Sequence, residues 1–180
     1  ENQDVTFDYT ISDGEGGSDS ADVTINVTGL DSIGTTINRN DDMNNETLNS
    51  LDGFGNNNDT LNVSDDIQGT STVSMYGGDD TVNVSDDIKS TASIDMGAGN
   101  DTINVSDDVK DYTEILMGTG DDTINVSDKI KGHADIDTGE GSDTITVSNK
   151  IEGDAKIDMG SDNDTLNVGG DIKGNAEIDM

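Results

Sequence analysis

Residues 97–117 read GAGNDTINVSDDVKDYTEILM, and this 21-residue pattern recurs without a change of register over residues 53–180. The dipeptide Asp-Thr marks each copy, and its aspartates are Asp59, Asp80, Asp101, Asp122, Asp143 and Asp164. A fixed period of this length is typical of proteins built from stacked structural repeats. The chain is therefore expected to fold as an array of similar coils.

Two short segments of each repeat alternate polar and apolar residues, as β-strands with one buried face do. In the quoted repeat these segments are residues 102–105 (TINV) and 114–117 (EILM). The first apolar position of each segment recurs along the chain, as Leu61, Val82, Ile103, Ile124, Ile145 and Leu166 and as Val73, Ile94, Ile115, Ile136, Ile157 and Ile178. One repeat cannot bury its apolar face alone, whereas stacked repeats form a continuous narrow core. We therefore predict an all-β fold, a parallel β-solenoid with 21-residue coils.

The composition is strongly acidic and poor in apolar residues. The 180 residues include 40 Asp and Glu against 8 Lys and Arg, a formal charge of −32, and only 29 % are hydrophobic. Such a chain lies close to disordered compositions, so something besides an ordinary core must stabilise it. Its negative potential repels nucleic acid and anionic lipid and concentrates cations, so we expect no nucleic-acid partner and no membrane insertion. Without cysteine, the chain has no disulfide and no thiol zinc site.

The repeats are preceded by two segments of different character. Residues 1–30 contain two alternating stretches, 5–11 and 22–27, joined by a turn-rich connection over 12–18. They resemble the terminal strands of the immunoglobulin-like or cadherin-like repeats of large bacterial adhesins. We expect residues 31–52 to form a degenerate N-terminal capping coil, because TIN at 36–38 matches TLN at 60–62.

Residues 53–180 supply six coils. Because the last repeat ends at Met180 without a polar cap, we expect neighbouring domains or copies of the same array to meet it end to end.

Each repeat contains a turn of the form Gly-x-Gly-x-Asp. Its first glycine is Gly55, Gly97, Gly118, Gly139 and Gly160, and its second is Gly78, Gly99, Gly120 and Gly141. Glycine permits positive φ and lets backbone carbonyls turn toward a bound ion. Asn57 and Asp162 replace the second glycine in two repeats, and both residue types tolerate the left-handed region. Tyr76 replaces the first glycine in one repeat, although tyrosine does not readily adopt the left-handed region.

Stacking places the six repeated aspartates in one column. Carboxylates about 4.8 Å apart repel by roughly 0.9 kcal/mol in water, and by about four times as much at an effective dielectric constant of 20. A hard divalent cation held by carboxylate and carbonyl oxygens would remove this repulsion, and a flexible cage of about 6–8 oxygens suits Ca²⁺ better than Mg²⁺. The alternative is that Asp, Asn and Gly merely form turns with solvated carboxylates. We expect a calcium column at these turns.

The turns resemble the repeats-in-toxin (RTX) calcium-binding β-roll, whose nonapeptide is Gly-Gly-x-Gly-x-Asp-x-apolar-x. Residues 97–104 and 118–125 match it except at the first glycine, where Met96 and Met117 stand. The resemblance covers residues 53–180. It implies a right-handed parallel β-roll, calcium-driven folding outside the cell, export by type I secretion, and membership of a large adhesin of the kind that supports cell adhesion and biofilms. The second half of each coil is longer than a nonapeptide, so we expect one regular calcium column and not two.

A second turn carries a Ser-Asp-Asp sequence. Its first acidic position is Asp65, Asp86, Asp107 and Asp128, followed by Asn149 and Gly170, and its second is Asp66, Asp87, Asp108, Lys129, Lys150 and Asp171. A ligand column should not change into lysine, and nearby Lys89, Lys110, Lys131 and Lys173 can offset the charge. We interpret this turn as a solvated, partly paired face, with a weaker cation site as the alternative. A further acidic column, Asp95, Asp137, Asp158 and Asp179, is interpreted as surface.

Three functions follow from these patterns. The first is a calcium-folded structural and adhesive module of a secreted bacterial surface protein, which folds in extracellular calcium. The second is an ice-binding or other flat-surface-binding solenoid that uses an outward grid of Thr60, Thr81, Thr102, Thr123, Thr144 and Thr165 with Asn62, Asn83, Asn104 and Asn125. The third, an enzyme, is not expected, because the single His133 occupies a variable turn position and a uniform repeat leaves no unique pocket.

Overall fold

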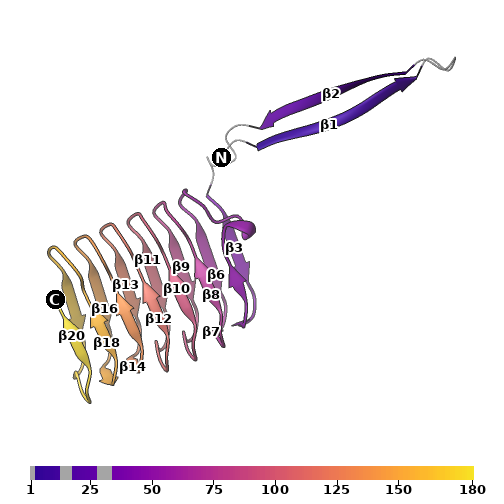
Figure 1. The fold of residues 1–180 in the computed structure, drawn as a ribbon. Coiled ribbons are helices and arrows are strands. Elements are labelled where there is room, and N and C mark those ends of the chain that lie inside the picture. The colour runs from indigo at the N-terminus through magenta and orange to yellow at the C-terminus, as the bar shows by residue number, and fades with distance from the viewer. Residues whose placement is uncertain (1–2, 13–17, 28–33) are drawn as a thin grey trace. The chain divides into compact units, whose positions relative to one another are not determined.

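A computed structural model describes residues 3–12, 18–27 and 34–180, which belong to two compact units, Glu1–Ile33 and Gly34–Met180. The first unit is an antiparallel hairpin of β1 (Gln3–Ser12) and β2 (Ser18–Val27), paired from Gln3 with Val27 to Ser12 with Ser18 (Figure 1). The two strands expected in this part of the chain lie within these elements. Residues 13–17 of the expected turn, residues 28–30 and residues 31–33 of the expected capping coil lie outside the described residues.

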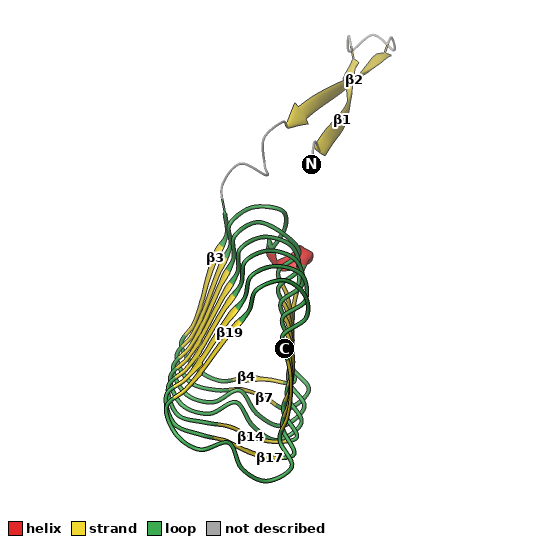
Figure 2. Ribbon diagram, turned by 90° about the vertical axis from the view of Figure 1, so that its left-hand side faces the viewer, coloured by secondary structure: helices red, strands yellow, loops and turns green. Residues whose placement is uncertain are grey.

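The second unit is an all-β parallel solenoid of about seven turns, which confirms the predicted fold class (Figures 1 and 2). One seven-stranded sheet contains β3 (Thr36–Arg39), β6 (Thr60–Val63), β9 (Thr81–Val84), β11 (Thr102–Val105), β13 (Thr123–Val126), β16 (Thr144–Val147) and β19 (Thr165–Val168). The other contains β5 (Thr47–Leu48), β8 (Thr72–Ser74), β10 (Ser93–Asp95), β12 (Glu114–Leu116), β15 (Asp135–Asp137), β18 (Lys156–Asp158) and β20 (Glu177–Asp179).

A third side of the solenoid is a thinner parallel ladder. It contains the pairs β4 (Met43–Asn44) with β7 (Ile67–Gln68) and β14 (Ile130–Gly132) with β17 (Ile151–Gly153), joined by single bridges such as Ile88 to Val109. The one helical element among the described residues is a 3-10 turn, η1 (Ser50–Asp52). No helix in the described ranges is long and apolar enough to cross a membrane.

Register follows the sequence period. Thr102 of β11 pairs with Thr123 of β13, 21 residues on, whereas Thr36 of β3 pairs with Thr60 of β6 at an offset of 24. Each coil therefore sets equivalent residues side by side, as parallel in-register strands do.

The core is built from the inward positions of all three sides. Ile103, Ile115 and Val109 represent the three main apolar columns, and all are completely buried. A methionine column, Met75, Met96, Met117 and Met159, is interrupted by the buried Thr138, whose hydroxyl donates to the carbonyl of Met159 at 2.8 Å. Burying one such side chain contributes about 1.5–3 kcal/mol, and the repetition makes this the main apolar stabilisation of the stack.

Ile115→Ala is expected to lower the free energy of unfolding by about 2–5 kcal/mol, because it opens a cavity in a fully buried column. Leu116→Ala is the matched control, since Leu116 is the next residue of β12 and points outward, 36 % exposed. Its effect should stay within about 0.5 kcal/mol. Urea unfolding of both variants measures the difference, and equal losses would contradict the inward and outward assignment.

Candidate cation sites

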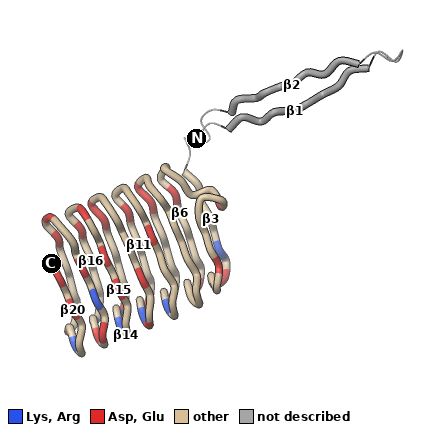
Figure 3. The backbone as a smooth tube through the Cα atoms, viewed as in Figure 1, with Lys and Arg blue, Asp and Glu red and all other residues tan. Residues whose placement is uncertain are grey.

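Two corners of the solenoid carry columns of aspartates. The glycine corner joins the second sheet to the first through residues such as 97–101, and the Ser-Asp corner follows the first sheet through residues such as 106–108. Figure 3 shows acidic residues recurring at corresponding places in successive coils. Both columns are consequences of the in-register stacking described above.

The glycine corner brings the backbones of adjacent coils very close together. Gly120 has a φ of +132°, and a Cβ atom placed on it would lie 1.8 Å from the carbonyl oxygen of Gly99. Glycine permits this close approach without strain, and the approach lines the corner with carbonyl oxygens. Asp162 adopts a φ of +93°, as its expected substitution for glycine requires.

The first repeat departs from this geometry. Gly55 and Asn57 are not among the described residues with positive φ, so the left-handed role expected for Asn57 is wrong. The coil before this repeat differs in length, because β3 pairs with β6 at an offset of 24 residues. A Cβ atom on Gly55 would meet nothing within 4 Å.

Tyr76 occupies the position of a corner glycine and adopts its backbone conformation, with a φ of +76°. The left-handed region costs an ordinary residue about 1–2 kcal/mol. Tyr76 is 46 % exposed, so it gains little burial in return.

Tyr76→Gly is therefore expected to raise the free energy of unfolding by about 1 kcal/mol. Gly118→Ala makes the reverse change, and its Cβ atom would lie 1.9 Å from the carbonyl oxygen of Gly97 at a φ of +103°, so it should destabilise. Denaturant unfolding checks both signs. A loss of stability in Tyr76→Gly would mean that packing of the ring outweighs backbone strain.

The repeated aspartates of the glycine corner are buried and point along the stack. Asp80, Asp101, Asp122 and Asp143 are each about 1 % exposed, Asp59 is also buried, and Asp164 is half-buried. The Oδ1 atom of each accepts a hydrogen bond from the backbone N–H of its equivalent in the preceding coil. The Asp101 N–H donates to Asp122 Oδ1 at 2.7 Å, for example, and the Asp122 N–H donates to Asp143 Oδ1 at 2.8 Å.

The second carboxylate oxygens of this column lack partners. Within the described part of the chain, the Oδ2 atoms of Asp80, Asp101, Asp122 and Asp143 are buried without a hydrogen bond. Asp59 differs, because its Oδ2 accepts from the Gly55 N–H at 2.9 Å. A buried oxygen without a partner costs about 1–3 kcal/mol, and more when charged. Each of these four oxygens is therefore suited to bind a proton or a hard cation.

Burial controls the acidity of the column. Loss of solvation raises the pKa of Asp80 to about 7, of Asp101 to about 6 and of Asp122 to about 7, and it also raises the pKa of Asp143. Backbone hydrogen bonds oppose this shift, and the charges of neighbouring aspartates add to it. Near neutral pH, the metal-free column therefore lies close to its own titration.

These raised pKa values predict that the metal-free chain loses stability as the pH rises. The folded chain holds the protons more tightly than the unfolded chain, so their contribution is complete below about pH 4, declines as the pH rises, and is gone once the pH has passed about 7. Thermal melting in EDTA at constant ionic strength measures the slope. Asp101→Asn with Asp122→Asn should flatten it, and a melting temperature that rises over the same interval would contradict the assignment.

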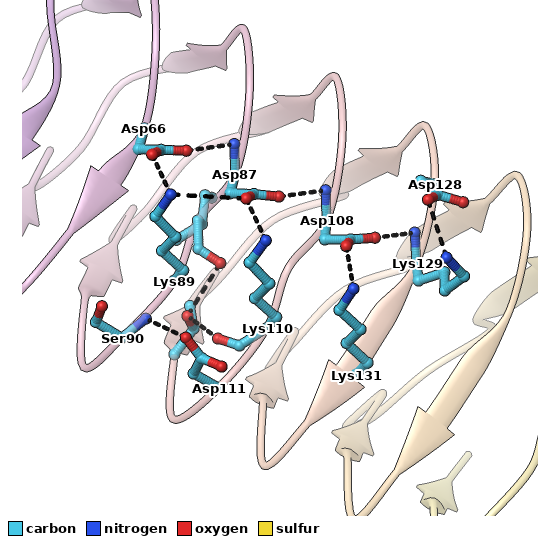
Figure 4. A network of polar contacts seen from close by, with 12 residues as sticks. Asp66, Asp87, Lys89, Ser90, Asp108, Lys110, Asp111, Asp128, Lys129 and Lys131 are labelled. Carbon is cyan, nitrogen blue, oxygen red and sulfur yellow. Dashed lines mark hydrogen bonds and ion pairs between the residues drawn. The ribbon is translucent and has the colours of Figure 1, made fainter.

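At the Ser-Asp corner, the expectation of a solvated face is wrong for the second aspartate of each pair. Asp66, Asp87 and Asp108 are only 6, 5 and 4 % exposed. Their Oδ1 atoms accept from backbone N–H groups of the next coil at 3.0 Å, and their Oδ2 atoms contact the ammonium groups of Lys89, Lys110 and Lys131 (Figure 4). The expected charge pairing is present at these three lysines. The corner buries the second aspartate because it points along the stack.

Three groups of carboxylates at this corner bring their ligand atoms within 4.8 Å of one another and could hold metal ions. The groups are Asp42 with Asp65 and Asp66, Asp66 with Asp86 and Asp87, and Asp87 with Asp107 and Asp108. Sequence reasoning assigned the metal to the glycine corner, where each coil supplies one repeated aspartate. The repeated Ser-Asp-Asp motif was the signal for the triads.

The expected Thr and Asn grid lies on the outer face of the first sheet. Asn62, Asn83, Asn104 and Asn125 form a ladder in which each Nδ2 donates to the preceding Oδ1 at 2.8–2.9 Å, beginning at Asn38. The Asn amide groups are therefore hydrogen-bonded to one another within the stack, and a ligand with a flat surface would have to compete for them. The contribution of this ladder is to hold adjacent coils in register.

Comparison of the chain with protein-family models, with curated proteins and with solved structures finds no match.

Proposed function

We propose that this chain is a calcium-folded structural and adhesive module of a secreted bacterial surface protein. The observation that supports calcium most directly is the row of buried Oδ2 atoms without partners at the glycine corner. Four successive coils repeat a buried carboxylate with one oxygen that lacks a hydrogen-bond partner. A turn formed only because Asp and Gly favour turns does not require such an oxygen.

The donor set suits a hard cation. Asp80, Asp101, Asp122, Asp143 and their equivalents would hold the ion together with carbonyl oxygens of the glycine corner. All of these donors are oxygens, and the corner contributes no histidine, cysteine, lysine or arginine side chain. Calcium accepts such sets with flexible geometry, whereas Mg²⁺ demands a near-ideal octahedron and retains water. A bound cation would supply the positive charge that the buried carboxylates lack.

The proposed mechanism links calcium to folding. Each ion that binds the folded chain and not the unfolded chain stabilises it by RT ln(1 + [Ca²⁺]/Kd), and the repeats add these contributions. At low cytosolic calcium, the −32 charge opposes compaction, and the chain would stay unfolded and exportable. In millimolar extracellular calcium it would fold. The adhesive, extracellular and type I secretion parts of the proposal rest on the sequence resemblances.

The test is a calcium titration of the 180-residue chain in EDTA-treated buffer, followed by circular dichroism. Folding is expected with a midpoint of about 0.1–1 mM calcium, and MgCl₂ should not reproduce it. A solenoid that is fully folded and indifferent to metal would overturn the proposal.

Asp101→Asn with Asp122→Asn makes the test specific to the column. The amides keep the Oδ1 acceptors but remove two carboxylate ligands, so the number of bound calcium ions and the melting temperature in saturating CaCl₂ should both fall. Asp95→Asn is the matched control, because Asp95 is exposed at the end of β10. It should change neither quantity. Equal shifts in both variants would indicate a general charge effect.

A further inference from the structure

Three lysines reach back from one coil to the coil before it. Lys89 contacts Asp66, Lys110 contacts Asp87 and Lys131 contacts Asp108, always across 23 residues and always at the Oδ2 atom (Figure 4). The lysines are half-buried and the aspartates are buried. These contacts are therefore partly shielded from water, unlike most surface ion pairs.

The ammonium groups lie on the carboxylates that form the triads. Lys89 Nζ contacts Asp66 Oδ2 and lies 3.8 Å from Asp87 Oδ2, and both aspartates belong to the triad with Asp86. The hydrogen bond and the charge of Asp66 raise the pKa of Lys89, so this amine stays protonated at neutral pH. A divalent cation in the same triad would have to displace the Lys89 ammonium group or bind against its positive charge.

The repeat also contains an internal charge reversal. Where the aspartate position of this corner becomes Lys129, the position 23 residues on, which is lysine in the three preceding coils, becomes Glu152. The charge of Glu152 is among those that raise the pKa of Lys129. The Lys129 ammonium contacts Asp128 Oδ2 of its own coil at 3.1 Å, so this position still sets a cation beside a carboxylate, and a metal ligand would not be replaced by lysine.

The first coil fits the same account, whereas the last pair departs from it. In the first coil, Asp42 Oδ2 accepts from Gln68 Nε2 at 2.5 Å, and Gln68 stands where the next three coils have lysine. In the last pair both positions are lysine, Lys150 and Lys173, and Lys173 turns to Asp171 of its own coil at 2.6 Å.

We propose that the Ser-Asp corner is a built-in counter-ion ladder, in which Lys89, Lys110 and Lys131 neutralise the buried aspartates that a divalent cation would otherwise bind. The coils then stack at the Ser-Asp corner without a metal ion, and the native chain binds divalent cations along the glycine corner alone. The second statement rests on the proposed function, whereas the ladder itself does not. Folding would thus depend on calcium at one edge and on the chain's own charges at the other.

A double-mutant cycle on the full chain tests the ladder by thermal melting in saturating CaCl₂, where the proposed function has the chain folded. Lys110→Met keeps the apolar stem but leaves the buried Asp87 carboxylate unpaired, so the melting temperature should fall by about 5 °C or more. Adding Asp87→Asn should recover most of that loss, because both charges are then gone. The matched control is Lys156→Met, since Lys156 and Asp135 are both half exposed. It should shift melting by about 1 °C at most. An unchanged melting temperature in Lys110→Met, or no recovery in the double variant, would overturn the ladder.

Calcium stoichiometry tests the assignment of edges. Equilibrium dialysis against CaCl₂ should give the same number of bound ions for the native chain and for the double variant Asp87→Asn with Lys110→Met. Asp101→Asn with Asp122→Asn should bind fewer. Loss of ions in the Asp87 double variant would overturn the one-edge assignment while leaving calcium folding intact. A native chain that binds no calcium would refute the proposed function, and the melting cycle would still decide the ladder.

Discussion

Repulsion between carboxylates buried in register is the constraint on which the rest of this solenoid depends. Parallel strands place each residue beside its own equivalent, so the stacking that joins isoleucine to isoleucine also joins aspartate to aspartate. In the outward columns water screens these charges. At the two acidic corners the carboxylates are buried, and the charge has to be balanced within the stack.

The two corners solve this problem with different chemistry. Both satisfy one carboxylate oxygen with a backbone N–H of a neighbouring coil, in opposite directions along the stack. At the Ser-Asp corner a lysine from the next coil contacts the second oxygen, while at the glycine corner the second oxygen of four coils has no partner. Where glycine stands at this corner, a Cβ atom would collide with the preceding carbonyl, and the corner contains no lysine or arginine that could serve as a counter-ion. The partner proposed there is therefore small and comes from solution.

The uncharged parts of the coil explain why the stack tolerates such charges. Three apolar columns run through the core, and the Asn ladder joins the outer face of one sheet by side-chain hydrogen bonds. These contacts fix the register independently of any ion. In the proposed function, these contacts set the register, and bound calcium offsets the carboxylate repulsion at the glycine corner so that the coils can stack.

The 21-residue period was enough to predict the parallel solenoid, its inward columns and the stacking of each aspartate on its equivalent, because strand alternation and repetition are local properties of a sequence. The tertiary structure decided how side chains lie along the stack axis. It buried Asp87 but left the preceding Asp86 half exposed, directed Lys110 to the coil before it, and kept Asn57 out of the left-handed region. A period specifies which residues are neighbours. The direction in which a long side chain reaches, and the oxygen it leaves without a partner, depend on the packing of whole coils against one another.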